Sequence, residues 1–245
     1  MDGKYLNDDE LISTINRSSM PYIIIEGKDD VAIYRWILDD IDCVGMLEPR
    51  GGCDGVEKIF NRRNEITNDK VLFIRDKDVG VYIDEFQEEC TEMIYTEGYS
   101  IENDLYQGKK IEEQLFEKED KELFSMALNS FLRYYACEIE KFKDNKEYDL
   151  KKKPEFILNH KDYSLKTNLL MDFKEPSVES FNYINDNYDI LLRGHSLFKL
   201  VRMILHRPKR NSKYEISNLY ELCYKFCKSD SIIRMQNKIK QIINN

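Results

Sequence analysis

The sequence predicts an α/β protein, in which a parallel sheet flanked by helices is followed by a mostly α-helical C-terminal domain. Short runs rich in β-branched and aromatic residues recur at 22–25, 44–47, 71–74 and 93–95. Unbroken apolar runs of this kind are typical of strands covered on both faces. Segments with helical periodicity separate the first three runs, and this alternation indicates a parallel sheet with right-handed crossovers. From about residue 109 the apolar spacing is helical.

The helices of the α/β part are expected between the strands. A first helix should begin after Asn7, because three acidic residues follow it and favour a helix N-terminus. Crossover helices are expected from about residue 30 and over about 54–60, where apolar residues recur at helical spacing. Ser100, after the fourth strand, is expected to cap a short helix.

Three further helices are expected near the C-terminus. The first is headed by Ser196 and stopped by Pro208, and the others lie at about 216–227 and 232–242. The sequence therefore predicts an α/β domain over residues 1–108 and a helical domain over residues 109–245.

Composition limits the class of protein. The chain has 245 residues, of which 42% are hydrophobic and 34% charged. It begins without the apolar core of a secretory signal, and no run approaches the ~18 apolar residues of a membrane span. Its six cysteines lack the spacing of a disulfide framework. We therefore expect a cytoplasmic protein with free thiols and no membrane association.

The charge is distributed unevenly along the chain. The net charge is −9, but residues 1–106 hold 11 of the 37 basic and 25 of the 46 acidic residues, a net −14, which leaves +5 on the remainder. The asymmetry suggests a metal-binding half and a polyanion-binding half, although ordinary solvated helix faces would give the same counts.

Acidic residues follow the first and third predicted strands. Glu26 ends the first, and Asp76 and Asp78 follow the third. If the two strands are neighbours, these acids meet at the sheet edge where open α/β sheets bind ligands. Asp76 and Asp78 should face the same way along an extended chain. Mg²⁺, with Mn²⁺ as the alternative, is the expected cofactor, because carboxylate oxygens are its usual ligands. Glu26 is then either a ligand or a general base.

Five stretches together carry a resemblance to a known family. They are Glu26-Gly27-Lys28-Asp29-Asp30, Arg50-Gly51-Gly52, Asp76-x-Asp78, Ser100-Ile101-Glu102-Asn103 and Arg193-Gly194-His195. Over roughly the first hundred residues the chain resembles the Toprim domain of topoisomerases, primases and OLD-type nucleases. The resemblance is closer to the Toprim nuclease effectors of the PARIS anti-phage defence systems, because all five stretches occur in the order typical of those effectors.

The resemblance implies an activity and partners that the residues alone do not give. It implies a metal-dependent endonuclease, a toxic effector that cleaves RNA, specifically tRNA, in phage-infected bacteria. It also implies an ABC-type ATPase partner that releases the effector, activity as a homodimer, and Glu102 as a further metal ligand. Catalysis would then rest on Glu26, Asp76 and Asp78.

Two alternatives stay open. One is a DNA endonuclease of the OLD type. The other is a non-catalytic Toprim subunit that binds or regulates an ATPase complex, although such a subunit has no need to keep three clustered acids.

Substrate contacts are expected from basic residues and from a glycine turn. Each candidate has a plain alternative: a solvated lysine, an ordinary tight turn, a histidine packed locally at a helix start, or a solvated basic face. Arg207, Lys209 and Arg210 are expected to track a nucleic-acid backbone. The full set is Lys28, Gly51, Gly52, Arg193, His195, Arg207, Lys209 and Arg210.

Overall fold

The computed structural model describes residues 6–83, 93–170, 173–208 and 210–243. The chain forms two compact units. The first comprises residues 1–97 and 228–245, and the second residues 98–227.

The first unit is built on a four-stranded parallel sheet. Its strands are β1 (Tyr22–Ile25), β2 (Met46–Pro49), β3 (Val71–Arg75) and β4 (Met93–Tyr95), in the order β2-β1-β3-β4. The α/β prediction with a parallel, helix-flanked sheet is confirmed, as is the adjacency of the first and third strands. The second strand lies two residues later than expected.

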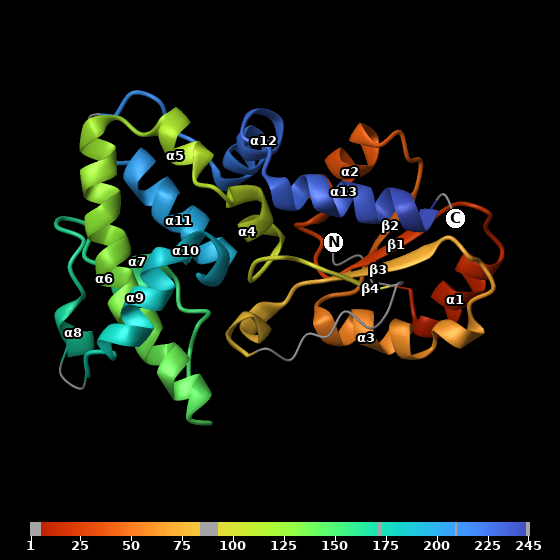
Figure 1. Ribbon diagram of the computed structural model, residues 1–245, viewed down its shortest axis with the longest axis horizontal. Coiled ribbons are helices and arrows are strands. Elements are labelled where there is room, and N and C mark those ends of the chain that lie inside the picture. Colours follow the sequence, from red (N-terminus) through yellow and green to blue (C-terminus); the bar gives the residue numbers. More distant parts are fainter. Residues whose placement is uncertain (1–5, 84–92, 171–172, 209, 244–245) are drawn as a thin grey trace. The chain divides into compact units, whose positions relative to one another are not determined.

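Helices cover both faces of this sheet (Figure 1). One face is covered by α2 (Val31–Asp40) and α13 (Asp230–Ile243), and the other by α1 (Asp8–Asn16) and α3 (Cys53–Asn61). Alternation along the strands divides the core between the faces. On β1, Tyr22 and Ile24 join the cluster formed with α1 and α3, and Ile23 and Ile25 are fully buried on the opposite side.

The final helix returns to the first unit. Its apolar residues Ile232, Met235 and Ile239 are buried, and α13 contacts α2 and β3. The sequence places the domain boundary between residues 108 and 109, whereas the compact units divide between residues 97 and 98 and again between 227 and 228. The difference arises because α13 buries its apolar stripe against the sheet unit.

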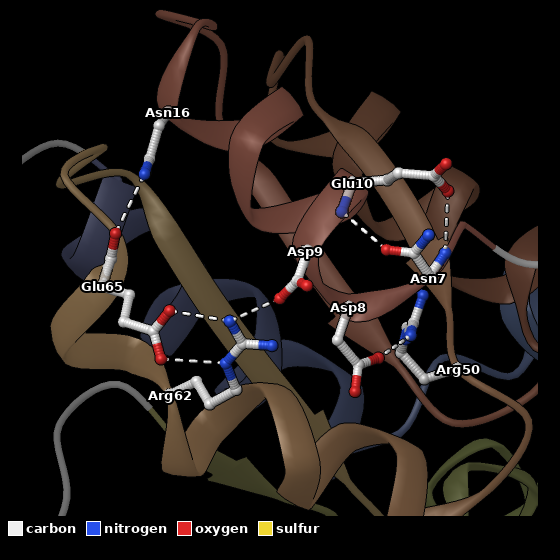
Figure 2. A network of polar contacts seen from close by, with 8 residues as sticks. All are labelled: Asn7, Asp8, Asp9, Glu10, Asn16, Arg50, Arg62 and Glu65. Atoms are coloured by element: carbon white, nitrogen blue, oxygen red, sulfur yellow. Dashed lines mark hydrogen bonds and ion pairs between the residues drawn. The ribbon is translucent and has the colours of Figure 1, made fainter.

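Polar contacts hold α1 to the segments around it. Arg62 pairs with both Asp9 and Glu65, at 2.7 Å each (Figure 2). Arg50, whose side chain is only 6% exposed, pairs with Asp8 at 2.5 Å (Figure 2). Because Arg50 also donates to the carbonyl of Leu6 at 2.9 Å, this arginine of the Arg-Gly-Gly stretch ties the start of α1 to the end of β2.

The second unit is largely helical in its described part. The longest helix, α6, is amphipathic, and its buried side contacts α9 and α11. Ser100 is the N-cap residue of α4, as the sequence predicts. The helices are α4 (Ile101–Tyr106), α5 (Lys110–Leu115), α6 (Lys118–Lys143), α7 (Pro154–Ile157), α8 (Thr167–Leu170), α9 (Val178–Asp186), α10 (Tyr188–Leu191), α11 (Gly194–Leu205) and α12 (Ile216–Phe226).

Within the described ranges, no helix combines the length and the apolar character needed to span a membrane. The cysteines at 43, 53, 137, 223 and 227 are free thiols, and Cys90 lies outside the described residues.

Candidate metal centre

The centre lies where β1 and β3 end. The two strands pair in parallel, with Ile24 opposite Phe73, so their carboxyl ends meet at one sheet edge. Glu26 is the residue after β1, and its Oε1 accepts a hydrogen bond from the backbone N–H of Asp76 at 3.0 Å. The expected meeting of the two acidic segments is therefore observed within the first unit.

The chain after β3 turns, and the expectation of an extended Asp76-x-Asp78 segment is wrong. Lys77 has α-helical dihedral angles, and Asp78 has φ +49° at the start of the 3₁₀ helix η2 (Asp78–Tyr82). Aspartate tolerates this left-handed conformation better than most residues. The turn, and not strand alternation, therefore brings the side chain of Asp78 to the sheet edge.

Three side chains gather close enough to share a cation. Potential ligand atoms of Glu26, Cys53 and Asp78 all lie within 4.8 Å of one another. Asp76 is not in this group and contributes its backbone N–H to Glu26. The carboxylate oxygens suit Mg²⁺ and Mn²⁺, and a thiol beside them suits a softer divalent ion such as Zn²⁺.

Cys53 is a site residue that the sequence reasoning missed. It is the first residue of α3 and directly follows the Arg50-Gly51-Gly52 turn. The signal that could have identified Cys53 is its position directly after the Arg50-Gly51-Gly52 stretch, which is part of the family resemblance. A thiol between two acids has a raised pKa, and the cause is first burial and then the charge of Glu26.

The environment makes ionisation of Glu26 costly. Burial raises the pKa of Glu26 to about 7, the charges of Asp78 and Asp30 add to the rise, and the N–H of Asp76 and the charge of Arg75 oppose it. A carboxyl group that is hard to ionise alone is stabilised as an anion by a bound cation. Arg75 at the end of β3, paired with Glu57, is a second residue of this edge that the sequence reasoning missed.

Glu26→Gln should stabilise the metal-free protein in a pH-dependent way. The pKa of Glu26 is raised from 4.5 to about 7 in the folded state, so wild-type stability is lost as pH rises between these values. Glutamine does not titrate and keeps an acceptor for the N–H of Asp76. The gain should be near zero below pH 4.5 and reach about 2–3 kcal/mol above pH 7, measured by urea unfolding in EDTA.

Two controls sharpen this measurement. The exposed neighbour Asp29, replaced by asparagine, should give no comparable gain. Adding Mg²⁺ should stabilise the wild type and not Glu26→Gln. A gain that is the same at pH 5 and pH 8 would show that ionisation of Glu26 carries no penalty.

The turn formed by Gly51 and Gly52 has a structural role at this edge of the sheet. The N–H groups of Gly51 and Gly52 both donate to the carbonyl oxygen of Glu26, at 2.8 and 3.0 Å. Their φ angles of +77° and +123° favour glycine. These N–H groups are thus engaged within the protein, which matches the tight-turn alternative and leaves phosphate binding by them without support. Lys28, the other candidate of this edge, is exposed.

Glu102 belongs to the second unit, so the structure does not group it with the acids of the first unit. Its Oε2 accepts from the Ser100 hydroxyl at 2.5 Å, and its Oε1 from the Tyr220 hydroxyl at 3.3 Å. Its role as a further metal ligand remains a prediction from the resemblance.

The fold brings two of the resemblance-carrying stretches together in the second unit. A Cβ placed on Gly194 would lie 2.6 Å from the Ser100 hydroxyl and 2.7 Å from the Cβ of Glu102, so only glycine allows this approach of α11 to α4. The side-chain amide of Asn103 donates to the carbonyl oxygen of Leu192 at 2.8 Å and so holds the segment before α11. His195, in the first turn of α11, is half-buried beside this junction.

Arg207 and Arg210 bind a buried carboxylate within the second unit. Asp120 is fully buried, and its Oδ1 accepts from Arg207 Nε at 2.8 Å while its Oδ2 accepts from Arg210. The arginine side chains are themselves only 10% and 8% exposed. Their expected role as a nucleic-acid surface is therefore replaced by a structural one. Lys209 lies outside the described residues.

Comparison with known proteins adds no relative: no protein-family model matches the chain, and no curated protein matches its sequence.

Proposed function

We propose that this chain is a Mg²⁺-dependent endonuclease of the Toprim class. The observation that supports this best is the convergence of the carboxylates of Glu26 and Asp78, with the backbone N–H of Asp76 bonded to Glu26, where two adjacent parallel strands end. Phosphodiester hydrolysis needs an activated water and stabilisation of charge on the attacking and leaving oxygens. A bound Mg²⁺ would supply that charge stabilisation.

In this proposal the residues of the centre bind the cation, orient a ligand and accept a proton. Asp78 and Glu26 are the proposed ligands, with Glu102 added by the resemblance. The backbone N–H of Asp76 orients Glu26. The alternative role of Glu26 is that of a general base that does not bind the cation. Its pKa of about 7 in the metal-free protein suits that role near neutral pH.

The substrate and setting of the proposal come from the family resemblance. In this proposal the chain is the toxic effector of a PARIS-type anti-phage defence system in the bacterial cytoplasm. It cleaves tRNA as a homodimer once an ABC-type ATPase partner releases it. Mn²⁺ is an alternative cofactor, because the carboxylates of Glu26 and Asp78 suit it as they suit Mg²⁺.

Sequencing of nucleic-acid ends in cells tests the proposal. The chain is produced with the partner ATPase, the system is triggered by phage, and the wild type is compared with Glu26→Gln. New tRNA ends in the wild type alone are expected. Breaks in DNA in place of tRNA ends would favour the OLD-type alternative. If an intact complex yields neither, the non-catalytic subunit is the better description.

A further inference from the structure

The start of α11 gathers basic side chains from two segments. Arg193 is the N-cap residue of this helix, His195 lies in its first turn, and Lys199 follows one turn later. Lys153 comes from the N-cap position of α7, which contacts α11. All four residues belong to the second unit.

Lys199 is held in an unfavourable place for a cation. Its side chain is 12% exposed, and in the described part of the chain the carboxylate paired with it is that of Glu155, as far as 4.0 Å away. The pKa of Lys199 is lowered, first by burial and also by the nearby charges of Lys153 and Arg193, while the charge of Glu155 opposes the shift. Keeping an ammonium group here costs free energy, which a bound anion would offset.

The pKa of His195 is affected by the same positive charges. Its pKa is lowered by burial first and then by the charge of Lys199. The charge of Glu102 acts in the opposite direction, and Arg193 and Lys153 make smaller contributions to the lowering. Both oxygens of Glu102 already accept hydrogen bonds from hydroxyl groups. These hydrogen bonds leave the charge of Glu102 in place. With Glu155 it gives two carboxylates beside the three cations Lys153, Arg193 and Lys199, so these residues carry an excess of one positive charge.

The helix start adds donors to this cluster. The first turn of a helix directs unpaired N–H groups and the positive end of its dipole outward. The hydroxyl of Ser196, in the same turn, is buried and has no hydrogen-bond partner in the described ranges. Buried polar groups are normally satisfied, so the Ser196 hydroxyl is an unused donor in this turn. The N–H groups of Arg193 and Ser196 are engaged within the protein, with the Tyr135 hydroxyl at 3.1 Å and the Arg193 carbonyl at 2.9 Å.

We propose that Lys153, Arg193, His195 and Lys199 form a site for a backbone phosphate of a nucleic-acid strand. The inference rests on the proposed function and adds the place where the second unit holds the substrate. Lys153 is exposed, so the cluster opens to solvent, where a strand can pass. The site is separate from Arg207 and Arg210, whose guanidinium groups bind Asp120 and also pair with Glu119 and Glu117.

Binding measurements in a Glu26→Gln background test the site without cleavage. Lys199→Gln should weaken binding of a labelled tRNA transcript about 5- to 10-fold and reduce the salt dependence by the equivalent of about one phosphate contact. Lys121→Gln, which removes an exposed lysine from α6 of the same unit, is the matched control and should change binding by less than about 2-fold.

Stability separates a binding lysine from a structural one. Because Lys199 is half-buried beside two other cations, Lys199→Gln should keep or raise the melting temperature. A clear fall in melting temperature would assign Lys199 to the pair with Glu155 and overturn the proposal. So would tRNA binding and a salt slope equal to those of the control.

A second probe separates this site from the proposed activity. Inorganic phosphate, titrated while the imidazole of His195 is followed by NMR, should raise the pKa of His195 in the wild type and much less in Lys199→Gln. If phosphate binds in this way but the wild type cleaves nothing, the anion site stands and the nuclease proposal falls. If the wild type cleaves tRNA and Lys199→Gln cleaves and binds equally well, the site falls and the nuclease stands.

Discussion

Replacing Glu26 with glutamine or Asp78 with asparagine is expected to lower cleavage by about 10³-fold or more. Each change removes a charged oxygen that the proposal assigns to the cation, and a loss of about 4 kcal/mol of transition-state stabilisation corresponds to that factor. The side chains stay similar in size, so the fold should persist. The rate of tRNA cleavage under saturating Mg²⁺ is the measurement.

The variant Asp76→Asn, compared with Glu26→Gln and Asp78→Asn, tests whether the carboxylate of Asp76 also contributes to activity. The variant keeps the backbone N–H that donates to Glu26 at 3.0 Å, so any loss of activity reports on the carboxylate alone. A loss as large as that of Asp78→Asn would add Asp76 to the ligands.

Asp69→Asn is the matched control for the acids. Asp69 is exposed and precedes β3, at the opposite end of the strand from the centre. It should retain full activity. Full activity in Glu26→Gln would contradict the catalytic role and favour a binding subunit.

The sequence predicted the sheet well where strands are covered on both faces. Residues 22–25 and 71–74 are buried, and their apolar runs are unbroken. The second strand was placed two residues early because it lies at the sheet edge, where Met46 is 45% exposed and Val44 is 77% exposed. An edge strand carries a weaker burial signal, and it can end in a proline such as Pro49.

Sequence patterns did not show which distant segments pack against one another. Helical periodicity showed that α13 buries a stripe, but it did not show that the stripe packs on α2 and β3. The acids at the ends of β1 and β3 were predicted because parallel strands align their carboxyl ends. Cys53 was missed because a lone thiol gains meaning only from the neighbours that the fold supplies.

Charge density was the least reliable guide. Arg207 and Arg210 lie in the densest basic stretch, yet their partner Asp120 stands 87 and 90 residues earlier. A cluster of arginines in a sequence does not reveal whether the guanidinium groups face solvent or a buried carboxylate. Reversing the charge of Arg207 and Arg210 together is therefore expected to unfold the second unit, because two new carboxylates would face buried Asp120.

Asp120→Ala should therefore be among the most destabilising substitutions in the chain. The carboxylate is fully buried, accepts from Arg207 and Arg210, and also accepts the N–H of Glu117 at 3.0 Å at the start of α6. Its removal leaves two largely buried guanidinium groups without their shared anion. Breaking a buried pair in this way costs about 3–5 kcal/mol, which urea unfolding would measure.

Glu119→Ala provides the matched control for Asp120. Glu119 neighbours Asp120 on α6 and pairs with the same Arg207 at 3.0 Å, but its side chain is 67% exposed. An exposed pair contributes about 0–1 kcal/mol, so Glu119→Ala should be nearly neutral. If instead Asp120→Ala is as mild as Glu119→Ala and tRNA binding falls when Arg207 is replaced, the two arginines face the substrate, and the basic stretch regains the role that its charge density suggested.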